Sequence, residues 1–127
     1  INQTRYGPLT TAPIACSIET KSESARTGGL TQLGLWVAAW HKKMHAIQDF
    51  LSTDLARRPN AHDRIPSSLL IQVVDHDWTL FFACDNASAI TLHGPTKIGS
   101  TTSLEEARAL VASLEVIKAW METTFRE

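Results

Sequence analysis

Glu19, Thr20 and Lys21 are three consecutive residues whose types suit phosphodiester hydrolysis. In a strand the side chains alternate, so Glu19 and Lys21 would share a face, about 7 Å apart at a rise of roughly 3.3 Å per residue. The carboxylate can hold a hard divalent cation such as Mg²⁺. The ammonium can position an attacking water or stabilise charge developing on a phosphate. A surface ion pair at the end of a strand explains the same residues, because such triplets are common.

Two other groups of residues carry metal-ligating or acid–base types. His41 and His45 are one helical turn apart and could share a zinc ion. No Cys or carboxylate stands at a spacing that would complete such a site, so two solvent-exposed histidines are expected. Asp75, His76 and Asp77 could form an acid–base or metal site, but Asp is also favoured in tight turns, so a hairpin turn is the preferred interpretation.

A strand over residues 14–21 is predicted to present the triplet. Its side chains alternate between the two faces of the strand. Ile14, Cys16 and Ile18 fall on one face, and Ala15, Ser17 and Glu19 fall on the other. Residues 22–29 are expected to form a polar loop in which Gly28 and Gly29 allow a turn.

A long helix is predicted over residues 30–58, directly after this loop. Its apolar residues recur at steps of three and four, which is typical of a helix with one face against a core. They are Leu33, Trp36, Val37, Trp40, Met44, Ile47 and Leu51. Arg57 and Arg58 are expected to end the helix, because Pro59 disfavours helical conformation in the residue before it.

The rest of the chain predicts a hairpin, a third strand and a closing helix. The hairpin strands span residues 68–74 and 78–84, the third strand spans 89–93, and residues 94–102 are expected to form a loop. The helix over 103–125 begins with Ser103 and Glu106 at the spacing of a reciprocal capping box. Its expected apolar face consists of Leu104, Leu110, Val111, Leu114, Ile117, Met121 and Phe125. This order of elements predicts an α/β fold, with α+β as the alternative, in which helices flank a mixed sheet.

Composition and charge narrow the functional classes. The 127 residues, 43% hydrophobic and 20% charged, are typical of one globular domain. The apolar runs are much shorter than the roughly 20 residues that span a bilayer, so no membrane partner is expected. Twelve basic and 13 acidic residues give a net charge of −1, so nucleic-acid binding would need a local patch. Cys16 and Cys84 favour two buried reduced thiols, which predicts an intracellular location, nuclear or cytoplasmic.

The motifs around Glu19 resemble the fungal group of PD-(D/E)XK nuclease-like domain proteins. The strand reads S-I-E-T-K from Ser17 to Lys21, and the helix after it opens Q-L-x-x-W from Gln32 to Trp36. The resemblance continues through the hydrophobic strand that leads to Trp78, the G-S-T loop at 99–101 and the final helix. It covers nearly all 127 residues and implies a restriction-endonuclease-like core.

This resemblance implies a role for each residue of the motif. Glu19 would ligate a Mg²⁺ or Mn²⁺ ion, Thr20 would offer its backbone carbonyl to the metal, and Lys21 would be the catalytic lysine. Gln32 would lie near the site, and Trp36 stands where more distant relatives place tyrosine. The implied activity is metal-dependent hydrolysis of nucleic acid.

One departure from the family pattern concerns the second metal ligand. The family supplies it as an aspartate on a preceding strand, whereas the first 18 residues here contain no Asp or Glu. The family core also begins with a helix and two strands, for which residues 1–127 leave no room. We therefore expect a single nuclease-like domain over 1–127 that is incomplete at its N-terminus and inactive alone. Its sheet edge would pair with the missing N-terminal segment or with a second copy.

Two other functions stay open on the sequence. The chain could be a catalytically inactive nuclease-like module that binds nucleic acid or a protein partner. It could also be a small domain that shares the scaffold of a nuclease and nothing else, because fold does not fix function.

Overall fold

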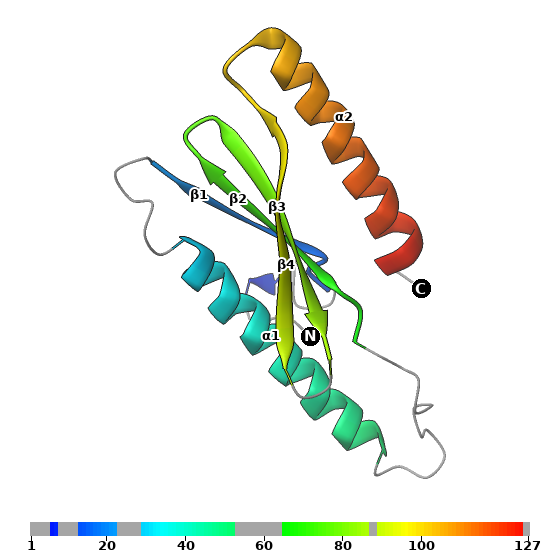
Figure 1. Cartoon of the computed structure of the whole chain (residues 1–127). Coiled ribbons are helices and arrows are strands. Elements are labelled where there is room, and N and C mark those ends of the chain that lie inside the picture. Colours follow the sequence, from blue (N-terminus) through cyan, green and yellow to red (C-terminus); the bar gives the residue numbers. More distant parts are fainter. Residues whose placement is uncertain (1–5, 8–12, 23–28, 53–64, 87–88, 126–127) are drawn as a thin grey trace.

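A four-stranded mixed sheet lies between two long helices (Figure 1). The computed structural model describes residues 6–7, 13–22, 29–52, 65–86 and 89–125. In chain order the elements are β1 (Cys16–Lys21), α1 (Gly29–Ser52), β2 (Ser68–Val74), β3 (Asp77–Asp85), β4 (Ile90–Ser100), α2 (Leu104–Trp120) and a short π-helical turn, η3 (Met121–Phe125). The predicted mixed sheet with flanking helices is confirmed.

The strands follow one another across the sheet in the order β1-β2-β3-β4. β1 and β2 are parallel, and α1 forms the crossover that such a pair requires. β2 and β3 form the predicted antiparallel hairpin, with Val74 opposite Asp77 across the turn. β4 adds antiparallel to β3. In this sheet β1 and β4 are the two edge strands.

The core has two layers because side chains of β2 alternate between the sheet faces. Leu70 packs toward α1, where it joins Leu33 and Val37. Leu69 and Ile71 point the other way and pack with Ile117 of α2. Leu69, Leu70 and Ile71 are each 2% exposed or less, as predicted for an apolar strand covered on both faces.

Helix α1 buries only part of the stripe predicted for it. Leu33, Val37 and Trp40 are buried, whereas Trp36 and Ile47 are exposed. The expected helix end at Arg57–Pro59 lies outside the described residues, as does most of the expected loop at 22–29. In the part of the chain that the structure describes, neither α1 nor any other helix has the length and apolarity needed to cross a bilayer.

Strand β4 is longer than predicted. The sequence suggested a strand over 89–93 followed by a loop over 94–102, but β4 runs to Ser100. Gly94 and Pro95 indicate a loop in the sequence. Both are accommodated in β4 because an edge strand need not donate every backbone N–H. An edge strand also tolerates irregular pairing, and β4 shifts register twice against β3. Gly94 has a φ of 132°, which favours glycine. Gly99 is needed for close packing, since a Cβ there would lie 2.6 Å from the Leu110 Cβ.

Helix α2 begins with half of the predicted capping box. The Glu106 backbone N–H donates to the Ser103 hydroxyl at 3.2 Å. The Glu106 carboxylate accepts from the Thr102 hydroxyl instead of reaching back to Ser103. Leu104 and Val111, predicted to be apolar-face residues, are exposed. The stripe that packs inward consists of Leu110 and Ile117, which are buried, and Leu114 and Met121, which are partly buried, at steps of three and four. The predicted helix to residue 125 ends instead in η3.

We expect Leu70→Ala to lower the free energy of unfolding by about 2–5 kcal/mol, because the truncation leaves a cavity between α1 and the sheet. Leu104→Ala is the matched control. Leu104 is 70% exposed and Leu70 is 1% exposed, so the control should change stability by no more than about 0.5 kcal/mol. Chemical denaturation of the three proteins measures both values. Equal losses in the two variants would contradict the core described here.

Candidate functional site

Glu19 and Lys21 form an ion pair on the α1-facing side of β1. The Lys21 Nζ lies 3.1 Å from the Glu19 Oε1, and both side chains are partly exposed. Glu19 is the register partner of Gln72 on β2, and Lys21 is the partner of Val74. The predicted shared face of Glu19 and Lys21 is confirmed. Solvent screens a pair at this exposure, so its contribution to stability is small.

Gly29, the first residue of α1, brings the helix start close to this pair. A Cβ on Gly29 would lie 2.8 Å from the Gln72 Nε2 and 3.3 Å from the Lys21 Cγ. Real Cβ atoms do not approach so closely, so a larger residue at this position would displace the Lys21 or Gln72 side chain. Glycine therefore allows α1, Lys21 and Gln72 to meet.

Gln72 is a site residue that the sequence reasoning missed. It lies beside Glu19 in the parallel register and its amide reaches the start of α1. In the sequence it is one polar residue within an apolar strand, 53 positions after Glu19. That interruption of the apolar run was the available signal, but the pairing of β1 with β2 is needed to place it.

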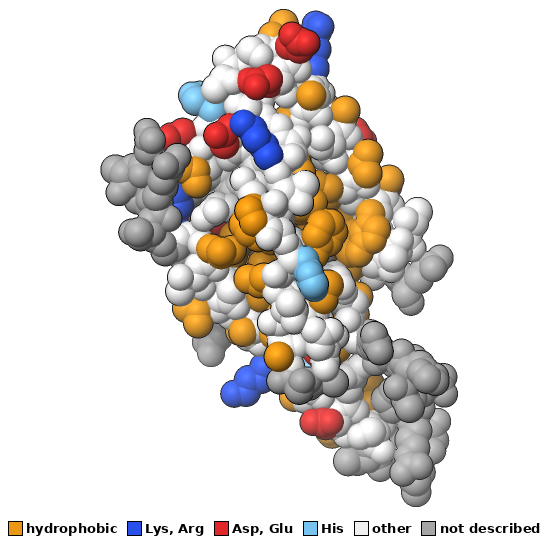
Figure 2. Space-filling view, in the orientation of Figure 1, with side chains coloured by type: hydrophobic (Ala, Val, Ile, Leu, Met, Phe, Trp, Pro, Cys, Tyr) orange, Lys and Arg blue, Asp and Glu red, His pale blue; other side chains and the backbone are white. Residues whose placement is uncertain are grey.

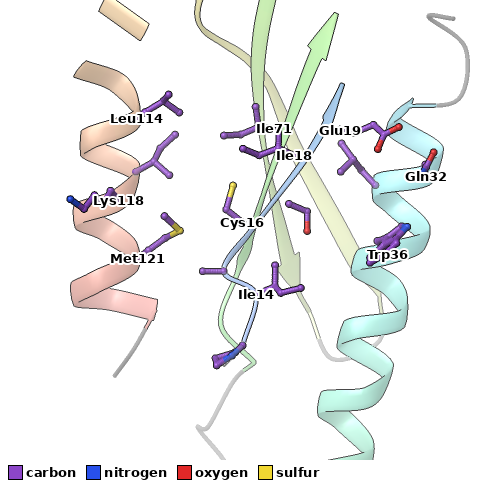
Figure 3. A pocket seen from close by; sticks show the side chains of 15 residues that line it. Ile14, Cys16, Ile18, Glu19, Gln32, Trp36, Ile71, Leu114, Lys118 and Met121 are labelled. Atoms are coloured by element: carbon purple, nitrogen blue, oxygen red, sulfur yellow. The ribbon is translucent and has the colours of Figure 1, made fainter. Parts of the chain in front are cut away.

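A cleft of about 830 Å³ runs along β1 and ends at Glu19. Its walls come from both helices, with α1 on one side of β1 and α2 on the other (Figure 3). Glu19, Gln32 and Trp36 line the α1 side, and Leu114, Ile117, Lys118 and Met121 line the α2 side. The carboxylate of Glu19 and the amide of Gln32 lie at the same end of the cleft in Figure 3. Gln32, which the family resemblance implies lies near the site, thus lines the same cleft as Glu19.

The cleft is apolar away from Glu19, Gln32 and Lys118. Ile18 and Trp36, both exposed, are among the apolar residues that line it. Burial raises the pKa of the Cys16 thiol to about 11, so it stays neutral in the cleft floor at physiological pH. Cys16 and Cys84 are free thiols, as predicted, although each is half-buried rather than fully buried.

The described residues do not complete a divalent-metal site around Glu19. Mg²⁺ and Mn²⁺ require several oxygen ligands at once, and carboxylates are the strongest of these. Glu19 is one carboxylate, already paired with Lys21. Among the described residues, no three His, Cys, Asp or Glu side chains are grouped so that they could hold a metal ion. The Thr20 side chain is exposed, on the opposite face from Glu19 by strand alternation.

The prediction of two solvent-exposed histidines on α1 is wrong. His41 is buried, and both His41 and His45 approach the Asp85 carboxylate. Asp85 lies at the end of β3, 40 residues after His45, so no local spacing connects it to the helix. Tertiary packing alone creates this cluster.

Asp75, His76 and Asp77 form the predicted hairpin turn. Asp75 has a φ of 52°, a left-handed conformation that Asp tolerates better than most residues. The His76 Nδ1 lies 2.9 Å from the Thr101 hydroxyl, and Asp77 pairs with Lys97 of β4 at 2.8 Å. These contacts connect the hairpin to the chain around β4.

Positive charge is scattered on the face of the molecule shown in Figure 2, where hydrophobic side chains gather over the middle of the sheet. Within the described part of the chain, Lys118 on the α2 wall lines the cleft, and Lys21 lies beside Glu19 at the end of the cleft. The positive charge at the candidate site is therefore that of Lys21, which pairs with Glu19.

A family profile for the PD-(D/E)XK nuclease superfamily matches residues 1–126, almost the whole chain. No curated protein and no solved structure gave a significant match.

We expect Gly29→Ala to displace the Lys21 and Gln72 side chains, because its Cβ would occupy their space. Gly34→Ala is the control in the same helix, since a Cβ at Gly34 meets no atom within 4 Å. Gly34→Ala should stabilise the protein by about 0.5–1 kcal/mol through helix propensity. Gly29→Ala should gain less and should shift the side-chain NMR signals of Lys21 and Gln72. Unchanged Lys21 signals in Gly29→Ala would contradict the close approach.

Proposed function

Because the chain belongs to the PD-(D/E)XK nuclease superfamily, we propose that it contributes part of the active site of a metal-dependent nuclease that hydrolyses phosphodiester bonds of nucleic acid. The observation that supports this most is the Glu19–Lys21 pair at 3.1 Å, with Gln32 in the same cleft. The S-I-E-T-K and Q-L-x-x-W motifs further suggest the fungal group of this superfamily.

In this proposal each residue keeps the role that its chemistry allows. Glu19 would supply one carboxylate ligand to Mg²⁺ or Mn²⁺, and the backbone carbonyl of Thr20 would supply another oxygen. A metal held there would supply charge stabilisation at the phosphate. The Lys21 ammonium faces the same place and stabilises negative charge that develops on the phosphate oxygens. The Gln32 amide orients water or substrate at the end of the cleft.

The remaining metal ligands would come from a partner strand at the edge of β1 opposite β2, which no described strand covers. β1 has β2 as its neighbour on one side, while the cleft occupies the other side. An unpaired strand edge recruits another strand. The walls of the cleft are apolar and come from both helices. An extended segment in the cleft would therefore be covered by α1 on one face and by α2 on the other. An aspartate on that segment would provide the second carboxylate, whether the segment belongs to a longer polypeptide or to a second copy.

A non-catalytic binding module is the second candidate function. It is favoured by the engagement of Glu19 with Lys21 and by the apolar surface of the cleft, which suits a peptide better than a phosphate backbone. In this alternative the strand at the β1 edge is the ligand itself, and the ion pair contributes to the surface around it.

The chain alone is expected to cleave DNA or RNA at most slowly in Mg²⁺ or Mn²⁺, because one carboxylate binds such ions weakly. A longer polypeptide that supplies an aspartate strand at the β1 edge should cleave DNA with Mn²⁺. Lys21→Ala in that polypeptide should slow cleavage by at least about 100-fold, since it removes a charge that stabilises the transition state. Plasmid nicking and single-stranded DNA and RNA cleavage, each with an EDTA arm, measure the effect.

Lys97→Ala is the matched control for this experiment, because Lys97 also pairs with a carboxylate, that of Asp77 on the hairpin. It should retain the wild-type rate. Cleavage by Lys21→Ala at the wild-type rate would remove Lys21 from the mechanism. A folded longer polypeptide that is inert with every divalent metal, yet binds nucleic acid or protein, would establish the binding-module alternative.

The partner strand has its own test. If a second copy fills the cleft, light scattering should give twice the 14.0 kDa chain mass, and Ile18→Lys should restore the single mass by placing a charge in the cleft floor. Val116→Lys, on an exposed position of α2, is the control and should not. If a segment of a longer polypeptide fills it, β1 amides should exchange more slowly there than in the chain alone. A single mass together with equal exchange would contradict both forms of pairing.

A further inference from the structure

A second cluster of titratable groups lies on α1, 12 residues beyond Gly29. It consists of His41 and His45 from α1 and Asp85 from the end of β3. The His45 Nε2 lies 2.6 Å from the Asp85 Oδ2, and the His41 Nδ1 lies 3.5 Å from the same oxygen. His41 and Asp85 have side chains that are 1% and 5% exposed, whereas His45 is 43% exposed. One buried carboxylate therefore faces two imidazoles.

His41 occupies a position that suits a neutral ring. Its edge contacts the Trp40 ring, with centroids 5.0 Å apart. Among the described residues, neither of its ring nitrogens has a hydrogen-bond partner of good geometry, and 3.5 Å to Asp85 is long. Burial lowers the pKa of His41 below its usual 6.5, and the Asp85 carboxylate offsets part of that effect. At neutral pH His41 is therefore uncharged.

Acidification places a positive charge on buried His41, beside a carboxylate that His45 already contacts. His45 has the short contact with Asp85, and the charge on His45 opposes protonation of His41. A cavity of about 520 Å³ adjoins the cluster. The other charged groups that line it are Lys42 and Asp49 from α1, while β4 and the residue before it contribute the apolar side chains of Ile90 and Ala89. A cation at His41 would be buried, because this side chain is 1% exposed.

The second half of α1 is less buried than the first half. The buried residues of α1 are Gly29, Leu33, Val37, Trp40 and His41, so none follows His41 within the described helix. Met44 packs partly against the cluster formed by Trp40, Ile65 and Phe125. Ile47 and Phe50 are exposed. The contact of His45 with Asp85 is thus one of the contacts that position this less buried part of the helix.

We propose that His41, His45 and Asp85 form an acid-sensitive latch, which holds the second half of α1 against the end of β3 at neutral pH and releases it on acidification. The unfolded or released segment binds a proton at His41 more readily than the packed helix does. The packed state therefore loses stability as the pH falls through about 6.5, and the loss levels off below the pKa of the packed His41. Across that window the equilibrium constant for opening should rise by as much as about tenfold per pH unit.

Hydrogen exchange between pH 7.5 and 5.5, corrected for intrinsic rates, tests the latch directly. Amides of residues 42–52 should lose protection on acidification before those of β2 do. In His41→Phe, which keeps an aromatic ring beside Trp40 but cannot be protonated, the protection of 42–52 should become nearly independent of pH in this window. His93→Phe, at an exposed position on β4, should retain the wild-type dependence.

A direct titration keeps the proposal falsifiable if His41→Phe does not fold. NMR of the wild-type imidazoles should show His41 protonating below pH 6.5, together with the loss of α1 protection. The latch is overturned if His41 titrates at or above 6.5, if residues 42–52 and β2 lose protection together, or if His41→Phe keeps the wild-type pH dependence.

Discussion

The parallel pairing of β1 with the buried strand β2 determines what the rest of the molecule can present. Leu69 and Ile71 must face α2 and Leu70 must face α1, because all three are almost completely buried. The register that follows sends Glu19 to the same face as Gln72 and carries Lys21 with it. A slip of one residue would turn Glu19 and Lys21 toward α2 and bury Ile18 against α1. The burial of three consecutive residues of β2 thus determines which face of the sheet carries the ion pair.

Helix α1 lies beside two carboxylates, those of Glu19 and Asp85, whose surroundings differ. Near its start, Glu19 is partly exposed and meets a lysine, so water and ions can reach the pair. Near its middle, Asp85 is buried and meets two histidines, so its surroundings respond to protons rather than to metal ions. The difference arises from exposure, since both carboxylates lie at the ends of strands next to the same helix. A rigid helix between them would let a change at one end alter the packing at the other.

Local patterns predicted the elements, and tertiary contacts decided the rest. The period-two pattern around Ile18 and the stripe from Leu33 to Trp40 required only neighbouring residues, so the strand, the helix and the shared face of Glu19 and Lys21 could be predicted. The burial of His41 and the nearness of Gln72 to Glu19 depend on strands that lie 30 or more residues away in the chain. The strand predicted for β4 ends at residue 93, because Gly94 and Pro95 suggest a loop. The place of β4 at the sheet edge allows both residues in a strand.

The two edges of the sheet also differ in a way that bears on polymerisation. β4 shifts register twice against β3 and contains a proline, which lacks an N–H, so a further strand finds no regular ladder on that side. β1 pairs without interruption over six positions and offers a regular edge. A further strand would therefore add to the sheet at β1 and not at β4. Two chains that joined edge to edge through β1 would present irregular β4 edges at both outer sides, so the assembly would stop at a closed pair instead of continuing into a fibre.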